Sequence, residues 1–152
     1  MDNKLDELLA KHKQSVVNQK EQMKNASKER GEQINNFKEQ FATLLNTTIR
    51  NKMKNITDRL TKNGHKVDIP EENKEREIAH PHLSYTIKID GRAQNFVKVI
   101  FVGNYDHKEV LIRTIVSKQG IKETKNSYDI IAVTDDLIEQ AIFNCFSKAL
   151  EY

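Results

Sequence analysis

Apolar residues recur at coiled-coil spacing along residues 2–62, a stretch that contains one Gly and no Pro. In its first part the repeating positions are separated alternately by four and three residues, which is the a/d pattern of a coiled coil. This first seam is weak, because two positions are polar and one is Ala. It comprises Leu5, Leu9, His12, Val16, Gln19, Met23 and Ala26. The spacing predicts a long helical arm at the start of the chain.

The apolar pattern strengthens after residue 33. We interpret the residues of this second part as an oligomerisation seam: Ile34, Phe37, Phe41, Leu44, Met53, Ile56 and Leu60. Between Ala26 and Ile34 the pattern steps twice by four residues, as a stutter does, and Gly31 lies in that interval. Two shapes stay open, a continuous helix of about 60 residues and a hairpin folded near Gly31. The absence of Pro and Asn-Gly turn signals favours the continuous helix.

The end of the arm has a clear signal. Asn63-Gly64 follows the last periodic residue, and Gly is the residue that most readily takes the left-handed conformation after a helix. Pro70 and Pro81 then prevent a helix from continuing through residues 65–82. We therefore divide the chain into an arm at 1–64, a linker at 65–82 and a head at 83–152.

The head has the pattern of an antiparallel β-meander. Leu83–Asp90 alternates apolar and polar residues and ends in the hairpin signal Asp90-Gly91. We expect further strands at 96–102, 109–117 and 128–134, with a loop at 118–127. Residues from Asp135 onward show a wide apolar helical stripe. The predicted fold class is α+β: a helical arm, a four-stranded antiparallel sheet and a C-terminal helix packed on one face. The other face is left half solvated, or covered by Phe37, Phe41 and Leu44 or by a second subunit.

Composition excludes several classes of protein. The chain has 31% charged residues, and its longest apolar runs fall far short of the ~20 residues that span a bilayer. The first residues are charged and contain no apolar core of a secretory signal. A single cysteine, Cys145, rules out an internal disulfide framework. We expect no membrane association and a cytoplasmic location.

Charge is distributed unevenly. Residues 1–66 carry 14 Lys and Arg against 8 Asp and Glu, whereas residues 67–152 carry 11 against 14. Much of the excess lies on one helical stretch whose basic residues could follow a phosphate backbone. Those residues are Arg50, Lys52, Lys54, Arg59, Lys62 and Lys66. The stretch has no exposed aromatic residue for base stacking, and a solvated helix face explains it more simply.

No catalytic, cofactor or metal motif emerges from the residue spacings. His80-Pro81-His82 could bring two imidazoles to one metal, but the spacings of structural zinc sites are absent. Asp129, Asp135, Asp136 and Glu139 gather near the start of the last helix, where capping explains them. Cys145 occupies an apolar helix position, and no Gly-rich phosphate loop occurs.

These observations favour a protein that is not an enzyme and has no cofactor. We interpret it as a homodimeric adaptor, chaperone-like or assembly protein that self-associates through its helix and presents the head to a protein partner. One alternative is a nucleic-acid-binding protein using the basic face from Arg50 to Lys66. A second alternative is a small metal-dependent hydrolase built on His80 and His82.

Overall fold

The computed structural model describes residues 2–68, 70–92, 94–118 and 120–150. The chain divides into two compact units, Met1–Asn36 and Phe37–Tyr152. Helix α1 (Asp2–Thr43) begins in the first unit and is uninterrupted at Gly31, as the continuous alternative predicted. A π-helix, η1 (Leu44–Ile49), and helix α2 (Arg50–Lys62) follow in the second unit. No helix in the described part of the chain is both long and apolar enough to cross a membrane.

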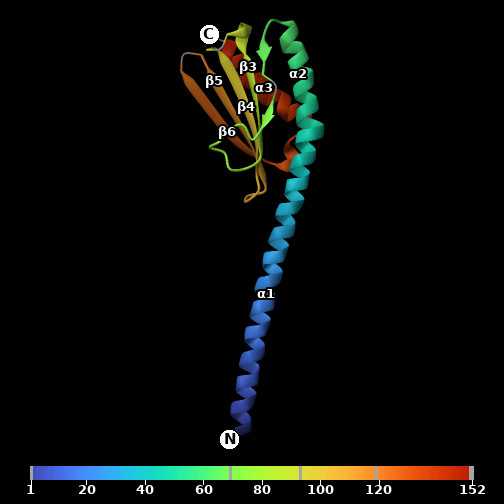
Figure 1. Cartoon of the computed structure of the whole chain (residues 1–152), viewed down its shortest axis with the longest axis vertical. Coiled ribbons are helices and arrows are strands. Elements are labelled where there is room, and N and C mark those ends of the chain that lie inside the picture. The colour runs from blue at the N-terminus through green and yellow to red at the C-terminus, as the bar shows by residue number, and fades with distance from the viewer. Residues whose placement is uncertain (1, 69, 93, 119, 151–152) are drawn as a thin grey trace. The chain divides into compact units, whose positions relative to one another are not determined.

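The second unit contains an antiparallel sheet, so the α+β class is confirmed. Five strands follow the order β1-β3-β4-β5-β6, and β2 also pairs with β3. Two of them are only two residues long, β1 (Lys66–Val67) and β2 (Glu71–Glu72). The long strands are β3 (His82–Lys88), β4 (Phe96–Asn104), β5 (Glu109–Ser117) and β6 (Ile121–Asp129). Figure 1 shows this sheet with α2 and α3 next to each other beside it.

The prediction of a four-stranded sheet is wrong in two places. Residues 65–82 were expected to form a linker, but β1 and β2 lie there and pair with β3. The last strand lies at Ile121–Asp129, which was expected to be mostly loop, and pairs with β5 from Glu109↔Asp129 to Ser117↔Ile121. Residues expected to form the last strand instead make a 3₁₀ turn, η3 (Ile130–Ala132), before helix α3 (Asp135–Leu150).

One face of the sheet carries the main core. Tyr85 of β3, Val99 and Phe101 of β4 and Ile112 of β5 point to this face and are buried. Helix α3 packs on it through Ile138, Ile142, Cys145 and Ala149. The same core contains residues from the end of α1, from η1 and from α2: Phe37, Phe41, Leu44, Leu45, Ile49, Met53 and Ile56. Both helical segments therefore share the α3 face. Of the alternatives left open for the opposite face, cover by Phe37, Phe41 and Leu44 is wrong.

The π-helix explains how one helical rod keeps such distant residues on one face. From Phe37 to Met53 an uninterrupted α-helix would rotate about 160° beyond whole turns, placing the two side chains on nearly opposite sides. A π-helix closes i→i+5 hydrogen bonds and rotates less for each residue. Six residues of π-helix at Leu44–Ile49 reduce the mismatch, and both Phe37 and Met53 are buried against the sheet.

Residues 73–82 cover part of the opposite face. Asn73, whose φ is positive, donates its N–H to the His82 carbonyl, and its side chain accepts from the His82 N–H. Glu75 forms an ion pair with Lys98 of β4, with side chains 16% and 20% exposed. Ile100 and Val102 of β4 are buried on this side. Residues 73–82 therefore pack on the sheet within the second unit.

Candidate interaction surfaces

Most of the predicted oligomerisation seam is buried inside the second unit. Phe37 and Phe41 are 3% and 1% exposed, and their rings are stacked with centroids 6.3 Å apart. Leu44, Met53 and Ile56 are also buried, whereas Ile34 and Leu60 are half-buried. These five buried side chains already have intrachain partners, so they offer little apolar surface to another copy.

Gly103 of β4 shows how closely the helix fits the sheet. A Cβ placed on Gly103 would lie 2.5 Å from Cδ1 of Phe41. The edge of the Phe37 ring meets Tyr105, with centroids 5.8 Å apart, and the Lys38 ammonium lies 5.1 Å from the centre of the same tyrosine ring. A glycine is needed here because only a residue without a side chain leaves room for the Phe41 ring.

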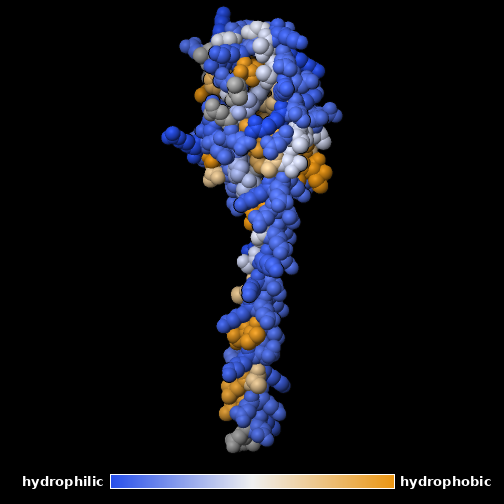
Figure 2. Space-filling view, turned by 45° about the vertical axis from the view of Figure 1, so that its right-hand side comes forward, coloured by the Kyte–Doolittle hydropathy of each residue, from blue (hydrophilic) through white to orange (hydrophobic). Residues whose placement is uncertain are grey.

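Four exposed apolar side chains gather in the first unit, where residues 2–36 are helical; others, such as Ile131 and Phe143, are exposed in the second unit. Leu5, Leu8, Leu9 and Met23 are 59%, 64%, 55% and 75% exposed. At about 100° for each residue these four side chains, with the half-buried Val16, fall on one side of the helix, and Met23 lies about five turns beyond Leu5. We call Leu5, Leu8, Leu9, Val16 and Met23 the N-terminal seam. Figure 2 shows hydrophobic patches along this helix.

The a/d pattern in the sequence included four of the five residues of the N-terminal seam and omitted Leu8. Leu8 was not among the residues of the predicted seam, although it lies about one turn from Leu5 on the same side of the helix. Val17 is 47% exposed but points to another side of the helix. The signal that distinguishes the two seams is size, because the aromatic residues that fill a sheet-covering core begin only at Phe37.

Half of the predicted basic face is paired with acidic groups of the same unit. Lys52 and Arg59 both meet Glu139 of α3, at 2.9 and 3.9 Å, and Arg50 forms an ion pair with Glu72. The hydrogen bond from Lys52, with the nearby charge of Arg59, lowers the pKa of Glu139 below its usual value. Lys54, Lys62 and Lys66 are exposed. Three of the six predicted cations are therefore paired with acidic side chains of the same unit.

His80 and His82 are held apart by different partners. His82 is buried, its Nε2 accepts the Glu75 N–H at 2.9 Å, and its Nδ1 lies 2.9 Å from the His80 carbonyl oxygen. His80 Nε2 lies 3.8 Å from Asp106. Both ring nitrogens of His82 are thus engaged in holding the 73–82 segment. Within residues 2–68, 70–92, 94–118 and 120–150, no three His, Cys, Asp or Glu side chains are placed to hold a metal ion.

The remaining candidates have structural roles. Thr134 caps α3 by accepting the Leu137 N–H at 3.3 Å, a role that the sequence had given to Asp135 and Asp136, which lie in the first turn. Asp129 accepts the Ile131 N–H at the 3₁₀ turn. Cys145 is buried, and burial raises the pKa of its thiol to about 12. A thiol of this kind is not a nucleophile at neutral pH.

Comparisons with protein-family models, with curated proteins and with solved structures give no match.

Proposed function

We propose that the protein is a non-enzymatic homodimer that acts as an adaptor or assembly component. The helix of residues 2–36 pairs with a second copy, and the second unit presents its α+β fold to a protein partner. The observation that carries this proposal is the N-terminal seam, a row of large apolar side chains on a helix against which nothing in its own unit packs.

Burial of this seam supplies the driving force for pairing. Helices gain most of their stability in proteins from packing an apolar face rather than from propensity. Full burial of one Leu or Met side chain contributes about 1.5–3 kcal/mol. Leu5, Leu8, Leu9 and Met23 on each copy therefore offer several such contributions, reduced by the polar His12 and Gln19 on the same side. A second copy is the natural occupant because the a/d spacing of this helix is complementary to itself.

The second unit offers a binding surface for a protein partner at the open edge of β6. This strand pairs with β5 along nine residues, and no other strand of the described residues pairs with its second edge. An open edge can accept an extended segment through main-chain hydrogen bonds, which is a common mode of peptide recognition. Lys122, Glu123 and Lys125 on β6 oppose indiscriminate pairing, as charges on edge strands do.

Light scattering after size-exclusion chromatography tests the self-association. We expect the parent to have a mass of twice 17.6 kDa and Leu9→Asp to have 17.6 kDa. Gln14→Asp is the matched control, because Gln14 lies about 180° from Leu5 around the helix and should leave the dimer intact. A monomeric parent, or equal loss of dimer in both variants, would overturn the proposal.

Nucleic-acid binding is less well supported. Its predicted surface loses Arg50, Lys52 and Arg59 to intrachain ion pairs. The same chromatography with absorbance at 260 and 280 nm, followed by titration with DNA and RNA at low salt, would reveal it. Binding that falls when Lys54, Lys62 and Lys66 are changed to Glu would favour this alternative.

A further inference from the structure

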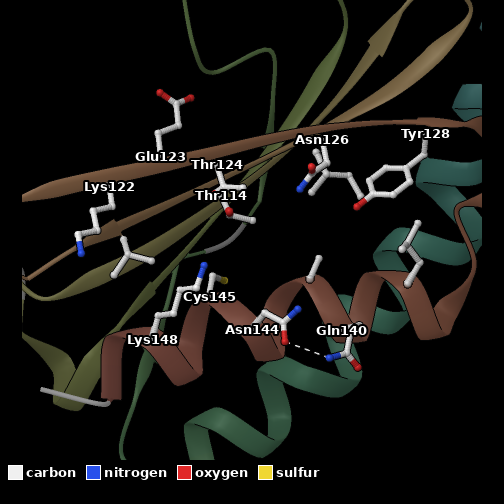
Figure 3. A pocket seen from close by; sticks show the side chains of 14 residues that line it. Thr114, Lys122, Glu123, Thr124, Asn126, Tyr128, Gln140, Asn144, Cys145 and Lys148 are labelled. Atoms are coloured by element: carbon white, nitrogen blue, oxygen red, sulfur yellow. Dashed lines mark hydrogen bonds between the residues drawn. The ribbon is translucent and has the colours of Figure 1, made fainter.

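A groove runs between the sheet and α3 in the second unit. Residues 121–127 of β6 are exposed, so the side of β6 that faces α3 is open rather than packed. The resulting cavity has a volume of about 570 Å³, within the roughly 300–1,000 Å³ of small-molecule sites. Figure 3 shows side chains from the strands and from the helix converging on it.

The walls are rich in neutral hydrogen-bonding groups. Alternation along β6 points Lys122, Thr124, Asn126 and Tyr128 toward the groove. Thr114 of β5 pairs with Thr124 and faces the same way. From the helix come Gln140 and Asn144, whose amides are hydrogen bonded to each other at 3.0 Å. These hydroxyl and amide groups can each donate and accept hydrogen bonds, so they suit a polar ligand.

The floor is apolar and its helix side is made of small residues. Ile112 and Val116 of β5 form the sheet side, and Ala141 and Cys145 of α3 lie opposite them. A larger side chain at either helix position would fill the space between α3 and β5. Such a floor gives the body of a ligand an apolar contact while the walls orient it.

Charge distinguishes the two ends of the groove. Lys122 and Lys148 lie at one end, and Tyr128 lies at the other, about 20 Å away along the strand. Glu123 belongs to the same strand, but its carboxylate points away from the groove in Figure 3 and meets Arg113 at 2.6 Å. The Glu123 carboxylate is therefore directed to the other face of the sheet, whereas Lys148 of α3 lies along the groove.

We propose that this groove binds a small organic anion, with a carboxylate or phosphate at Lys148 and a polar body along Thr114, Thr124 and Asn126. Lysine ammonium groups bind such anions by charge-assisted hydrogen bonds. All the lining residues belong to the second unit, so the site does not depend on the N-terminal seam.

A fragment screen on the full chain tests the site. Each of many scaffolds is supplied as a carboxylate, a phosphate and a primary amine, and binding is read from the backbone amide signals of Thr114, Thr124, Asn126 and Asn144 in ¹H–¹⁵N NMR spectra. We expect the carboxylate or the phosphate form to shift these signals and the amine form of the same scaffold to leave them unchanged. Comparison of the first two arms identifies which anionic group the site prefers.

Two charge reversals test where the anion binds: one on the helix changes the proposed site, and one on the strand is its control. Lys148→Glu should weaken the anionic hits by about tenfold or more, whereas Lys125→Glu, on the opposite face of β6, should leave them unchanged. Ala141→Phe should abolish binding by filling the floor; its folding is checked by the dispersion of the same spectra.

Equal binding of anions and amines, shifts outside the groove, or equal loss in Lys148→Glu and Lys125→Glu would overturn the proposal. So would a screen in which no scaffold shifts the groove signals. Leu9→Asp should keep the anion site while losing the dimer, so failure of one proposal is distinguishable from failure of the other.

Discussion

The Phe41 ring lies directly on Gly103, and this contact predicts how two substitutions combine. In Gly103→Ala the new methyl would lie 2.5 Å from Cδ1 of Phe41, well inside the optimum carbon–carbon separation of about 3.5–4.0 Å. Phe41 is 1% exposed and stacked on Phe37, so its ring has little room to move away. We therefore expect Gly103→Ala to lower the free energy of unfolding of the second unit by about 1–3 kcal/mol.

Phe41→Ala should cost more when made alone, about 3–5 kcal/mol, because it removes a buried ring and leaves a cavity against the sheet. In the double variant the methyl group that Gly103→Ala adds would enter that cavity instead of meeting a ring. The total cost should then be smaller than the two single costs together, by a coupling of about 1–3 kcal/mol. Phe41→Leu, a smaller change, serves if Phe41→Ala does not fold.

Urea unfolding followed by tyrosine fluorescence measures these costs in the second unit alone. The chain has no Trp, and all four Tyr follow residue 37. Leu9→Ala, on an exposed residue of the first unit, is the control and should change this transition by less than about 0.5 kcal/mol.

Strictly additive costs for Gly103→Ala and Phe41→Ala would show that the ring does not lie on the glycine. A different failure would be a Phe41→Ala variant whose unfolding is unchanged but whose mass falls from dimer to monomer. Phe41 would then face another copy, as the sequence pattern first suggested, and not its own sheet.

Three further predictions concern separate parts of the chain. His12→Leu and Gln19→Leu should each strengthen self-association, because each replaces a polar residue on the side of the helix that carries the N-terminal seam. Gln14→Leu, on the opposite side of the helix, should not. Sedimentation equilibrium measures the association of all three variants. Lys98 lowers the pKa of Glu75 below its usual 4.5, so the ionised carboxylate stabilises the fold above that value and the contribution is lost as pH falls through the lower folded pKa. Glu75→Gln should therefore cost about 1 kcal/mol in urea unfolding at pH 7, a difference that shrinks as pH falls below 4.5. Burial raises the pKa of Tyr85, whose hydroxyl donates to the Met53 carbonyl at 3.2 Å, so ultraviolet titration should show a late-ionising tyrosine that Tyr85→Phe removes.

The sequence predicts the helices well because their signals are local. Periodicity identified helix through residue 62, and Asn63-Gly64 marked its end, where Gly64 has a φ of 87°. Gly31 did not break the helix, because one Gly costs about 1 kcal/mol and its neighbours are good helix formers. The π-helix at Leu44–Ile49 was not foreseeable, since it follows from fitting two apolar stripes to one sheet face.

The last strand was missed because it lacks a buried face. Period-two alternation arises when one side of a strand is apolar, and residues 121–127 of β6 are all exposed. The apolar residues after Asp129 led to the wrong prediction of a strand at 128–134. Ile130 and Val133 pack at a 3₁₀ turn that leads into α3, rather than in a strand.

The groove was missed for the same reason, because β6 supplies one of its walls. Thr124, Asn126 and Tyr128 look like loop residues in the sequence, and only their pairing with β5 turns them toward α3. No spacing rule brings Lys122 of a strand and Lys148 of a helix to one end of a cavity.

Apolar periodicity alone could not say which stripe is used within the chain and which between copies. Both parts of the helix have the same spacing, and the stronger part, from Phe37 onward, is the one already covered by its own sheet. A strong apolar pattern therefore indicates that a helix face is buried, but it does not indicate whether the same chain or a second copy covers it. The weaker stripe at Leu5, Leu8, Leu9 and Met23 remains exposed, so it is the one that a second copy can cover. Because this stripe shares no residue with the core of the second unit, a substitution that separates the copies should leave that core folded, whereas one at Phe41 should not.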